Sequence, residues 1–180
     1  MLAVKPQELR NVVTGIRPSL SDRRPLLISV AAGIRASDIQ SWGGVPVVRC
    51  MPNRPALQGC GMTGLFATAD VSGERRTLAE KILGAVGATL WLEREADMDT
   101  VTAISGSGPA YFFLLIEILE QTGISLGLPA DVSRKLAVET AYGSGSMARD
   151  ADVPAATLRE QVTSKWQTAV IRIYAGQRLF

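Results

Sequence analysis

The chain has 180 residues, of which 47% are hydrophobic, 6% aromatic and 20% charged, and this globular composition argues against intrinsic disorder. Nineteen Lys and Arg residues against seventeen Asp and Glu residues leave a formal net charge of +2. The basic residues are dispersed in pairs such as Arg23–Arg24 and Arg75–Arg76, so we expect no nucleic-acid partner and interpret the pairs as solvated surface, with a phosphate-binding role as the alternative.

The first half of the chain alternates β-rich runs with helical segments. Short apolar runs predict strands at 25–30, 45–49, 62–68 and 88–92. Helical periodicity predicts helices over 36–41 and 74–86. This alternation is typical of an α/β fold, in which helices cover a sheet.

The opening residues Leu2-Ala3-Val4 resemble the end of a buried strand that runs directly into Lys5-Pro6. A domain that begins inside a strand exposes a sheet edge, which intact domains normally cover. We therefore expect an N-terminal truncation.

From about Asp97 the pattern becomes helical. Helices are predicted over 110–126, from Pro129 to about 147, and over 154–162. The first of these is almost wholly apolar apart from Glu117, which we interpret as a buried acid with a backbone or partner-chain donor. A helix that is apolar on most sides must be covered on most sides, so we expect a second subunit. The predicted domains are an α/β part, 1–96, and an all-α part, 97–180.

Several features limit the chemistry. The chain has no histidine, which excludes Ser-His-Asp and Cys-His catalysis and histidine-ligated metal sites. Cys50 and Cys60 lack further metal-ligating neighbours, so we expect two buried free thiols and no metal. No uninterrupted apolar stretch has the length of a membrane span, and the N-terminus lacks the pattern of a signal peptide, which predicts a cytoplasmic protein with no membrane partner.

Three loops are candidates for ligand contacts. Small residues at 105–109 precede a helix, where free N–H groups can bind an anion or a tight turn can let helices pack closely. Residues 30–33 and 51–55 each follow a strand, and taken alone they favour an ordinary strand-to-helix turn and a structural Asx turn at Asn53.

Polar side chains at two further places are candidates for a metal or substrate site. We interpret Glu95, Asp97 and Asp99 as a solvated connector or helix cap in preference to a metal cluster. The hydroxyls of Ser164 and Thr168 can orient a small carboxylate, although such residues at a helix end are usually caps.

Six segments, taken together, resemble the pyrroline-5-carboxylate reductase family in order and spacing: LAVKPQ, SVAAG, VVRCMPNRPA, DTVTAISGSGPAYFF, GISLGLP and QVTSK. The resemblance implies an oxidoreductase of proline biosynthesis that transfers hydride from NADPH or NADH to the imine of 1-pyrroline-5-carboxylate, giving L-proline. It also implies a partial Rossmann-type sheet followed by a helical dimerisation domain, and a homodimer or larger homo-oligomer. A protonated imine is already electrophilic, so the reaction requires no histidine acid.

The resemblance assigns roles to individual residues. It implies two loops that contact the cofactor, one acidic residue on the substrate side, and one loop that holds the substrate carboxylate. The cofactor residues are Ala3, Val4, Lys5, Pro6, Ala31, Ala32 and Gly33, and the substrate residues are Glu95, Ser164 and Thr168. Thr168 also contacts the ring nitrogen and is the predicted catalytic residue.

Two departures from the family pattern affect the expected activity. Trp166-Gln167 stand where the family has a glycine pair, and the family's first βαβ units, with the glycine-rich loop that cradles pyrophosphate, have no counterpart before Met1. We therefore expect that this chain neither binds NADPH tightly nor turns over, while its helical half self-associates. The alternative to an enzyme is an inactive remnant that acts only as a dimerising module. A different imine or 2-keto-acid reductase on the same plan is disfavoured by SGSGPAY.

Overall fold

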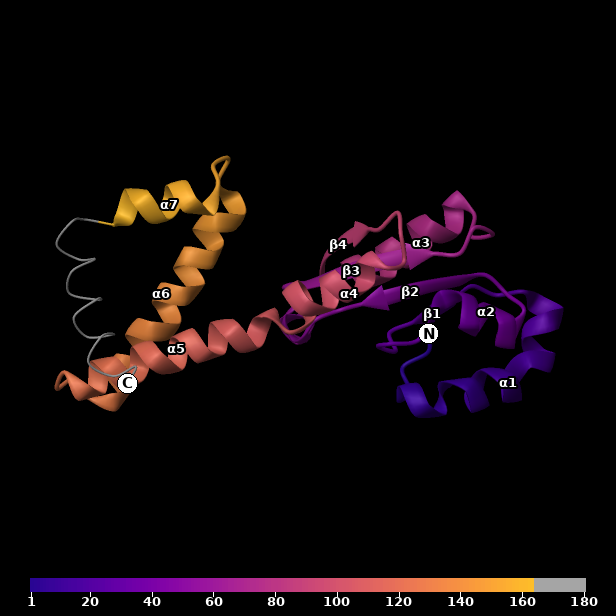
Figure 1. The fold of residues 1–180 in the computed structure, drawn as a ribbon, viewed down its shortest axis with the longest axis horizontal. Coiled ribbons are helices and arrows are strands. Elements are labelled where there is room, and N and C mark those ends of the chain that lie inside the picture. Colours follow the sequence, from indigo (N-terminus) through magenta and orange to yellow (C-terminus); the bar gives the residue numbers. More distant parts are fainter. Residues whose placement is uncertain (164–180) are drawn as a thin grey trace. The chain divides into compact units, whose positions relative to one another are not determined.

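The computed structural model describes residues 1–163 of the chain (Figure 1). Two compact units follow one another along the chain, Met1–Tyr111 and Phe112–Phe180. Residues 164–180, which include the predicted site residues Ser164 and Thr168, lie outside the described part.

The first unit is built on a four-stranded mixed sheet whose strands lie in chain order. They are β1 (Leu27–Ser29), β2 (Val47–Met51), β3 (Gly61–Ala67) and β4 (Gly87–Trp91). The pairs β1–β2 and β3–β4 are parallel, whereas β2 and β3 are antiparallel. All four predicted strands are confirmed, with bounds shifted by one or two residues.

The expectation that Leu2 belongs to a strand-like segment is also confirmed. Leu2 bridges to Ser29 in the parallel sense. Its N–H donates to the Ile28 carbonyl at 2.7 Å, and its carbonyl accepts from the Val30 N–H at 3.2 Å. Residues before Lys5 therefore extend the parallel side of the sheet beyond β1.

Helices of the first unit cover both faces of the sheet. They are α1 (Pro6–Arg23), α2 (Ala36–Gly43) and α3 (Gly73–Gly84), followed by the short α4 (Asp97–Val101), with a 3₁₀ turn η1 (Arg54–Gln58) and a π-helical turn η2 (Thr102–Gly106). Alternate residues of β1 and β2 pack on opposite faces. Leu27 and Val47 join the core formed with α1 and α2, and Ile28 and Val48 join the core formed with α3.

Helix α1 was not expected from the local sequence. This helix has a polar composition, contains Pro18, and buries only Leu9, Val13 and Leu20. A proline inside a helix removes one backbone hydrogen bond and weakens the helical signal, and here packing against the sheet overrides that penalty.

The second unit contains the helices predicted for it. Helix α5 (Gly108–Ser125) begins in the first unit and continues into the second, followed by α6 (Ala130–Asp150) and α7 (Ala155–Val162). Gly127, with a φ of +97°, forms the turn between α5 and α6, and the Leu128 N–H donates to the Gly123 carbonyl at 3.0 Å.

The first compact unit extends to Tyr111, beyond the predicted domain 1–96. The reason is that η2 packs on the sheet: a Cβ at Gly106 would lie 3.0 Å from the Met51 methyl group, and the Asn53 amide donates to Ser105.

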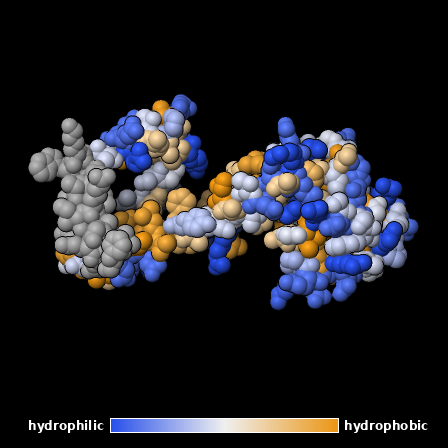
Figure 2. Space-filling view, in the orientation of Figure 1, coloured by the Kyte–Doolittle hydropathy of each residue, from blue (hydrophilic) through white to orange (hydrophobic). Residues whose placement is uncertain are grey.

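Apolar side chains of α5 are open to solvent in the single chain, and hydrophobic residues gather over this helix in Figure 2. Tyr111 and Phe112 are each 64% exposed and Leu115 is 50% exposed. Glu117 is exposed as well, so the prediction of a buried acid is wrong for the single chain. Within the helical stretch Asp97–Ser125, an 18-residue window has a mean hydropathy of 1.4, so by length and composition alone this helix could cross a membrane, although Glu117 interrupts its apolar run.

Candidate functional site

The parallel strands β1 and β2 end at one edge of the sheet, which we call the carboxyl edge. The loops that leave this edge are 30–35 after β1 and 52–53 after β2, and residues 3–5 leave it from the segment beside β1. In α/β sheets ligands bind outside the carboxyl ends of parallel strands, where loops present backbone groups. The two predicted cofactor-contacting loops therefore lie at the same edge.

Residues 3–6 form the entry to α1. Lys5 is the N-cap residue and Pro6 opens the helix, where its missing N–H costs no hydrogen bond. Ala3, Val4 and Lys5 are exposed. In the first turn of α1 Pro6 has no N–H and the Glu8 N–H donates to the Lys5 carbonyl at 3.0 Å, so the positive end of the helix dipole, beside the exposed residues 3–5, is what favours an anionic ligand here.

The loop after β1 is built for close approach of a ligand to the backbone. The Ala31 N–H donates to the buried Ser29 hydroxyl at 3.3 Å, which fixes the start of the loop. Ala31 is buried, whereas Ala32 and Gly33 are exposed. Gly33 has a φ of +75°, and no heavy atom would lie within 4 Å of a Cβ placed there.

A cavity of about 640 Å³ opens beside this loop. Its lining residues come from the loop, from α2, from β2 and from the segment around α4: Gly33, Arg35, Ser37, Arg49, Glu95, Ala96 and Asp99. The cavity brings together Gly33, predicted to contact the cofactor, and Glu95, predicted to face the substrate. Its lining carries two guanidinium and two carboxylate groups, so it suits a polar ligand with charges of both signs.

Glu95 is tied to the protein through one carboxylate oxygen. Its Oε1 accepts from the backbone N–H of Ala36 at 2.6 Å and from Arg49 Nη1 at 3.0 Å. The side chains of Arg49 and Glu95 are 7% and 20% exposed. Of the two roles expected for this acid, that of a solvated connector is wrong, because Glu95 forms a largely buried ion pair, whereas that of a helix cap is confirmed, because its carboxylate accepts from the first N–H of α2.

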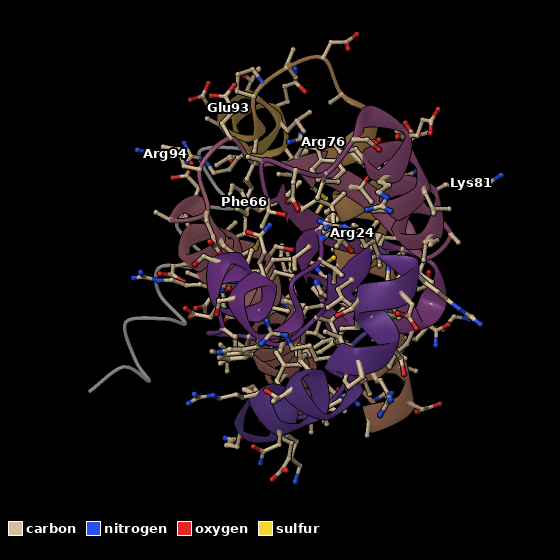
Figure 3. All side chains as sticks on the ribbon, turned by 90° about the vertical axis from the view of Figure 1, so that its right-hand side faces the viewer. Arg24, Phe66, Arg76, Lys81, Glu93 and Arg94 are labelled. Atoms are coloured by element: carbon tan, nitrogen blue, oxygen red, sulfur yellow. The ribbon has the colours of Figure 1, made fainter. Side chains whose placement is uncertain are left out.

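Asp97 and Asp99 differ from Glu95. Asp97, in the first turn of α4, forms an ion pair with the exposed Arg94, and Asp99 lines the cavity. Figure 3 shows the neighbouring Glu93 and Arg94 at the periphery of the first unit. Within residues 1–163 no three His, Cys, Asp or Glu side chains are grouped so that they could hold a metal ion.

The side chain of Asn53 forms hydrogen bonds with residues distant in the sequence and does not form the expected Asx turn. Its Nδ2 donates to the Ser105 carbonyl at 3.2 Å and to the Ser105 hydroxyl at 3.3 Å, and its Oδ1 accepts from the Met62 N–H at 2.9 Å. The expected Asx turn is therefore wrong, because the side chain of Asn53 joins η2 to β3 and makes no hydrogen bond that caps its own turn.

The small residues before α5 form part of a helix. The Ser107 N–H donates to the Thr102 carbonyl at 2.8 Å, which closes the π-helical turn, and the Ala110 N–H donates to the Ser107 carbonyl at 3.0 Å. These two amides are therefore used internally. The interpretation of the segment as a close-packed entry turn is favoured over anion binding at these two amides, and π-helical turns are common at functional sites.

The two cysteines have different environments. Burial raises the pKa of the Cys50 thiol to about 12. Cys60 is exposed, with its Sγ 3.5 Å from the Pro55 carbonyl oxygen. The prediction of a buried thiol is confirmed for Cys50 and wrong for Cys60. Cys60 lies two residues after the end of η1.

The two arginine pairs meet at the surface. Arg75 Nη2 donates to the carbonyl of Arg24 at 2.6 Å, and Arg24 ends α1 with a φ of 42°. The guanidinium of Arg76 lies 5.1 Å from the centroid of the Trp91 ring. Figure 3 shows Arg24 and Arg76 on the side of the unit that carries α3. These internal contacts support the interpretation of the pairs as surface structure.

Sequence reasoning missed the contributions of Arg35, Arg49 and Asp99 to the cavity. A signal existed for Arg49, because a single charged residue within the apolar strand Val47–Met51 requires a buried partner. Nothing in the local sequence marks Arg35, and the acidic spacing that drew attention to Asp99 did not indicate a cavity.

The chain is similar to known proteins over most of its length. Residues 95–170 match the family model described as "Pyrroline-5-carboxylate reductase dimerisation", and this match includes the apolar part of α5. The chain is 46% identical over 166 residues to a pyrroline-5-carboxylate reductase of Pseudomonas aeruginosa, covering 91% of the chain and 60% of that relative. It is 40% identical over 185 residues to a pyrroline-5-carboxylate reductase of Haemophilus influenzae, covering 98% and 67%.

Solved structures give the same result. A pyrroline-5-carboxylate reductase from Coxiella burnetii superposes with a TM-score of 0.88 at 36% identity, covering 98% of this chain and 67% of that one. The Plasmodium falciparum pyrroline carboxylate reductase with NADP bound superposes with a TM-score of 0.84 at 32% identity, covering 98% and 70%. The chain thus spans between about 60% and 67% of the length of the two curated relatives described above.

Proposed function

The chain belongs to the pyrroline-5-carboxylate reductase family, and on this premise we propose that it serves the transfer of hydride from NADPH or NADH to the imine of 1-pyrroline-5-carboxylate, which gives L-proline. The observation that carries the proposal is the cavity at the carboxyl edge, which joins Gly33 of a cofactor-contacting loop to Glu95. A relative with NADP bound, similar along nearly the whole of this chain, supports the choice of cofactor.

The residues of the carboxyl edge fit an extended anionic cofactor. Open space surrounds the Cβ position of Gly33, Ala32 and Gly33 are exposed, and the first turn of α1 begins after residues 3–5 at the same edge of the sheet. We propose that Ala3, Val4, Lys5 and Pro6, with Ala31, Ala32 and Gly33, hold the cofactor there. When bound, the reduced nicotinamide supplies the hydride.

The contribution of the chain to substrate binding is chiefly positional. A protonated imine accepts hydride without further activation, so the site has to hold the imine carbon against the hydride donor and keep the substrate carboxylate fixed. We propose that Ser164 and Thr168 bind that carboxylate, that Thr168 also acts at the ring nitrogen as the catalytic residue, and that Glu95 forms the substrate-side wall of the cavity.

A second copy of the chain is the proposed partner. The apolar side chains of α5 are half or more exposed at positions such as Tyr111, Phe112 and Leu115, and burying them removes apolar surface from water. The family match over residues 95–170 supports association through these helices. We propose that the chain forms a homodimer or larger homo-oligomer. We also propose a cytoplasmic location, because metabolism supplies the reduced cofactor there.

A specific observation favours a second candidate function, that of a dimerising module without activity. In the family that the chain resembles, a glycine pair stands where this chain has Trp166-Gln167. Bulky side chains restrict the approach of backbone to a ligand. Self-association is common to both candidates, so it does not separate them.

The deciding experiment uses the purified 180-residue chain. Oxidation of NADPH is followed by its absorbance on addition of 1-pyrroline-5-carboxylate, and proline is quantified in the same sample. Turnover that Thr168→Val abolishes supports the enzyme. A folded, self-associating chain that neither binds NADPH nor forms proline supports the dimerising module.

A further inference from the structure

Glu95 connects three segments that are far apart in the sequence. Its Oε1 contacts Arg49 Nη1 in the middle of β2 and the Ala36 N–H at the start of α2, which lie 46 and 59 residues away. Glu95 itself belongs to the connector between β4 and α4. One carboxylate therefore fixes the position of the connector on the sheet and on the loop before α2.

Both donors need this carboxylate. Arg49 is only 5% exposed, and a buried guanidinium without a counter-ion is strongly unfavourable. The Ala36 N–H is one of the amides in the first helical turn that has no acceptor inside its own helix, and the N-cap residue Arg35 supplies no side-chain acceptor. Glu95 therefore provides the negative charge that Arg49 needs and the hydrogen-bond acceptor that the Ala36 N–H needs.

Two of the segments that Glu95 joins line the same cavity. Gly33 and Arg35 come from the loop, and Glu95, Ala96 and Asp99 come from the connector and α4. Beyond α4 the chain is held separately, because Asn53 donates to Ser105 of η2. Within residues 1–163, the wall formed by residues 95–99 would without Glu95 keep the buried side chain of Met98 as an anchor, and the Asn53–Ser105 hydrogen bond would hold the chain beyond α4.

We infer that Glu95 is a positioning residue that sets the separation between the cofactor loop, 31–35, and the wall formed by residues 95–99. The identity of the ligand between these walls rests on the proposed function, whereas the positioning itself rests on the contacts of this chain. Glu95 acts on the ligand through Ala36 and Arg49, in addition to any direct contact with the substrate.

Three variants and one control test this role. Glu95→Gln keeps an amide oxygen for the Ala36 N–H but loses the charge for Arg49, Glu95→Ala loses both, and Arg49→Met removes the buried cation. Glu93→Gln, two residues away on the exposed side of the connector, is the matched control. Amide hydrogen exchange of the full chain is measured by mass spectrometry, and the affinity for NADPH is measured by tryptophan fluorescence.

We expect exchange in residues 31–36 to accelerate about tenfold or more in Glu95→Ala, less in Glu95→Gln, and not in Glu93→Gln, while exchange in β3 and α6 stays unchanged. We expect NADPH affinity to fall in the same order. In a double-mutant cycle of Arg49→Met and Glu95→Ala, we expect the two losses of NADPH binding free energy to be non-additive. If the ion pair were purely structural, only the two losses of unfolding free energy would be non-additive.

The outcomes separate this inference from the proposed function. Unchanged exchange at 31–36 in Glu95→Ala, or equal acceleration in every segment, overturns the positioning role. If the unsubstituted chain binds no NADPH, the proposed cofactor function of this chain fails, and the rank order of exchange among the four variants still decides whether Glu95 positions the loop.

Discussion

Asn53 and Ser105, which are 52 residues apart, are joined by two hydrogen bonds from one side-chain amide, at 3.2 Å and 3.3 Å. The same side chain accepts from the Met62 N–H. We expect Asn53→Ala to lower the free energy of unfolding by about 2 kcal/mol, because it leaves partly buried groups without partners. Urea unfolding measures this change. Asn11→Ala, at an exposed position of α1, is the control and is expected to change stability by less than about 0.5 kcal/mol.

Gly33 and Gly44 both have a positive φ, of +75° and +70°. Alanine at either position is expected to cost about 1 kcal/mol of stability, since a Cβ disfavours the left-handed region. Only Gly33 lines the cavity, whereas Gly44 ends α2. We therefore expect Gly33→Ala to weaken NADPH binding and Gly44→Ala to leave it unchanged, as measured by fluorescence titration. Equal losses of affinity would contradict a role for the Gly33 loop in holding the cofactor.

The two thiols are expected to react at very different rates. Burial raises the pKa of Cys50 to about 12, so at neutral pH it is fully protonated as well as inaccessible. Cys60 is exposed. Labelling with a disulfide reagent should modify one thiol per native chain and two after denaturation. Cys60→Ser should abolish the fast reaction, and persistence of a fast reaction in this variant would show that Cys50 is accessible.

The exposed face of α5 predicts self-association. Placing a charge there with Leu115→Asp is expected to shift the chain from a dimer or larger oligomer to a monomer, because the carboxylate would be buried without a partner. Light scattering after size-exclusion chromatography gives the mass. Leu57→Asp places the same charge on a residue that is 78% exposed in η1, and it should leave the mass unchanged.

Ser133 has a buried hydroxyl without a hydrogen-bond partner among residues 1–163, at a close approach of α6 to α5. A Cβ at Gly123 would lie 2.7 Å from this oxygen. We expect Ser133→Ala to stabilise the chain by about 1 kcal/mol, because an unpaired buried polar group is removed. Thermal unfolding tests this, with Ser125→Ala as the control, since the Ser125 hydroxyl donates to the Thr122 carbonyl.

Most secondary structure could be predicted from local sequence. Runs of apolar and β-branched residues located all four strands, and prolines located the starts of α6 and α7. The short elements η1, α4 and η2 were not predicted. Among the longer helices the exception was α1, whose polar composition and internal Pro18 conceal a helix that the sheet stabilises. Local patterns also gave no orientation for β3, because the antiparallel pairing with β2 depends on how the chain turns between them.

The site could be predicted only in part. Resemblance supplied Gly33 and Glu95, and the structure places both at one cavity. The partners of Glu95, however, lie 46 and 59 residues away, and no local signal specifies such a contact. The same holds for Asn53, for which a turn was expected from its neighbours, whereas tertiary packing directs its amide to Ser105. The roles assigned to Ser164 and Thr168 stay predictions.

The sequential strand order β1-β2-β3-β4 bears on how the sheet assembles. Each strand pairs with the one that precedes it along the chain, and the Leu2 segment pairs with β1, which follows it. The shortest connection joins the antiparallel strands β2 and β3, so closing this loop carries the smallest entropy cost. This order favours nucleation at the β2–β3 pair and growth outward in both directions, and no later strand has to insert between two that have already paired.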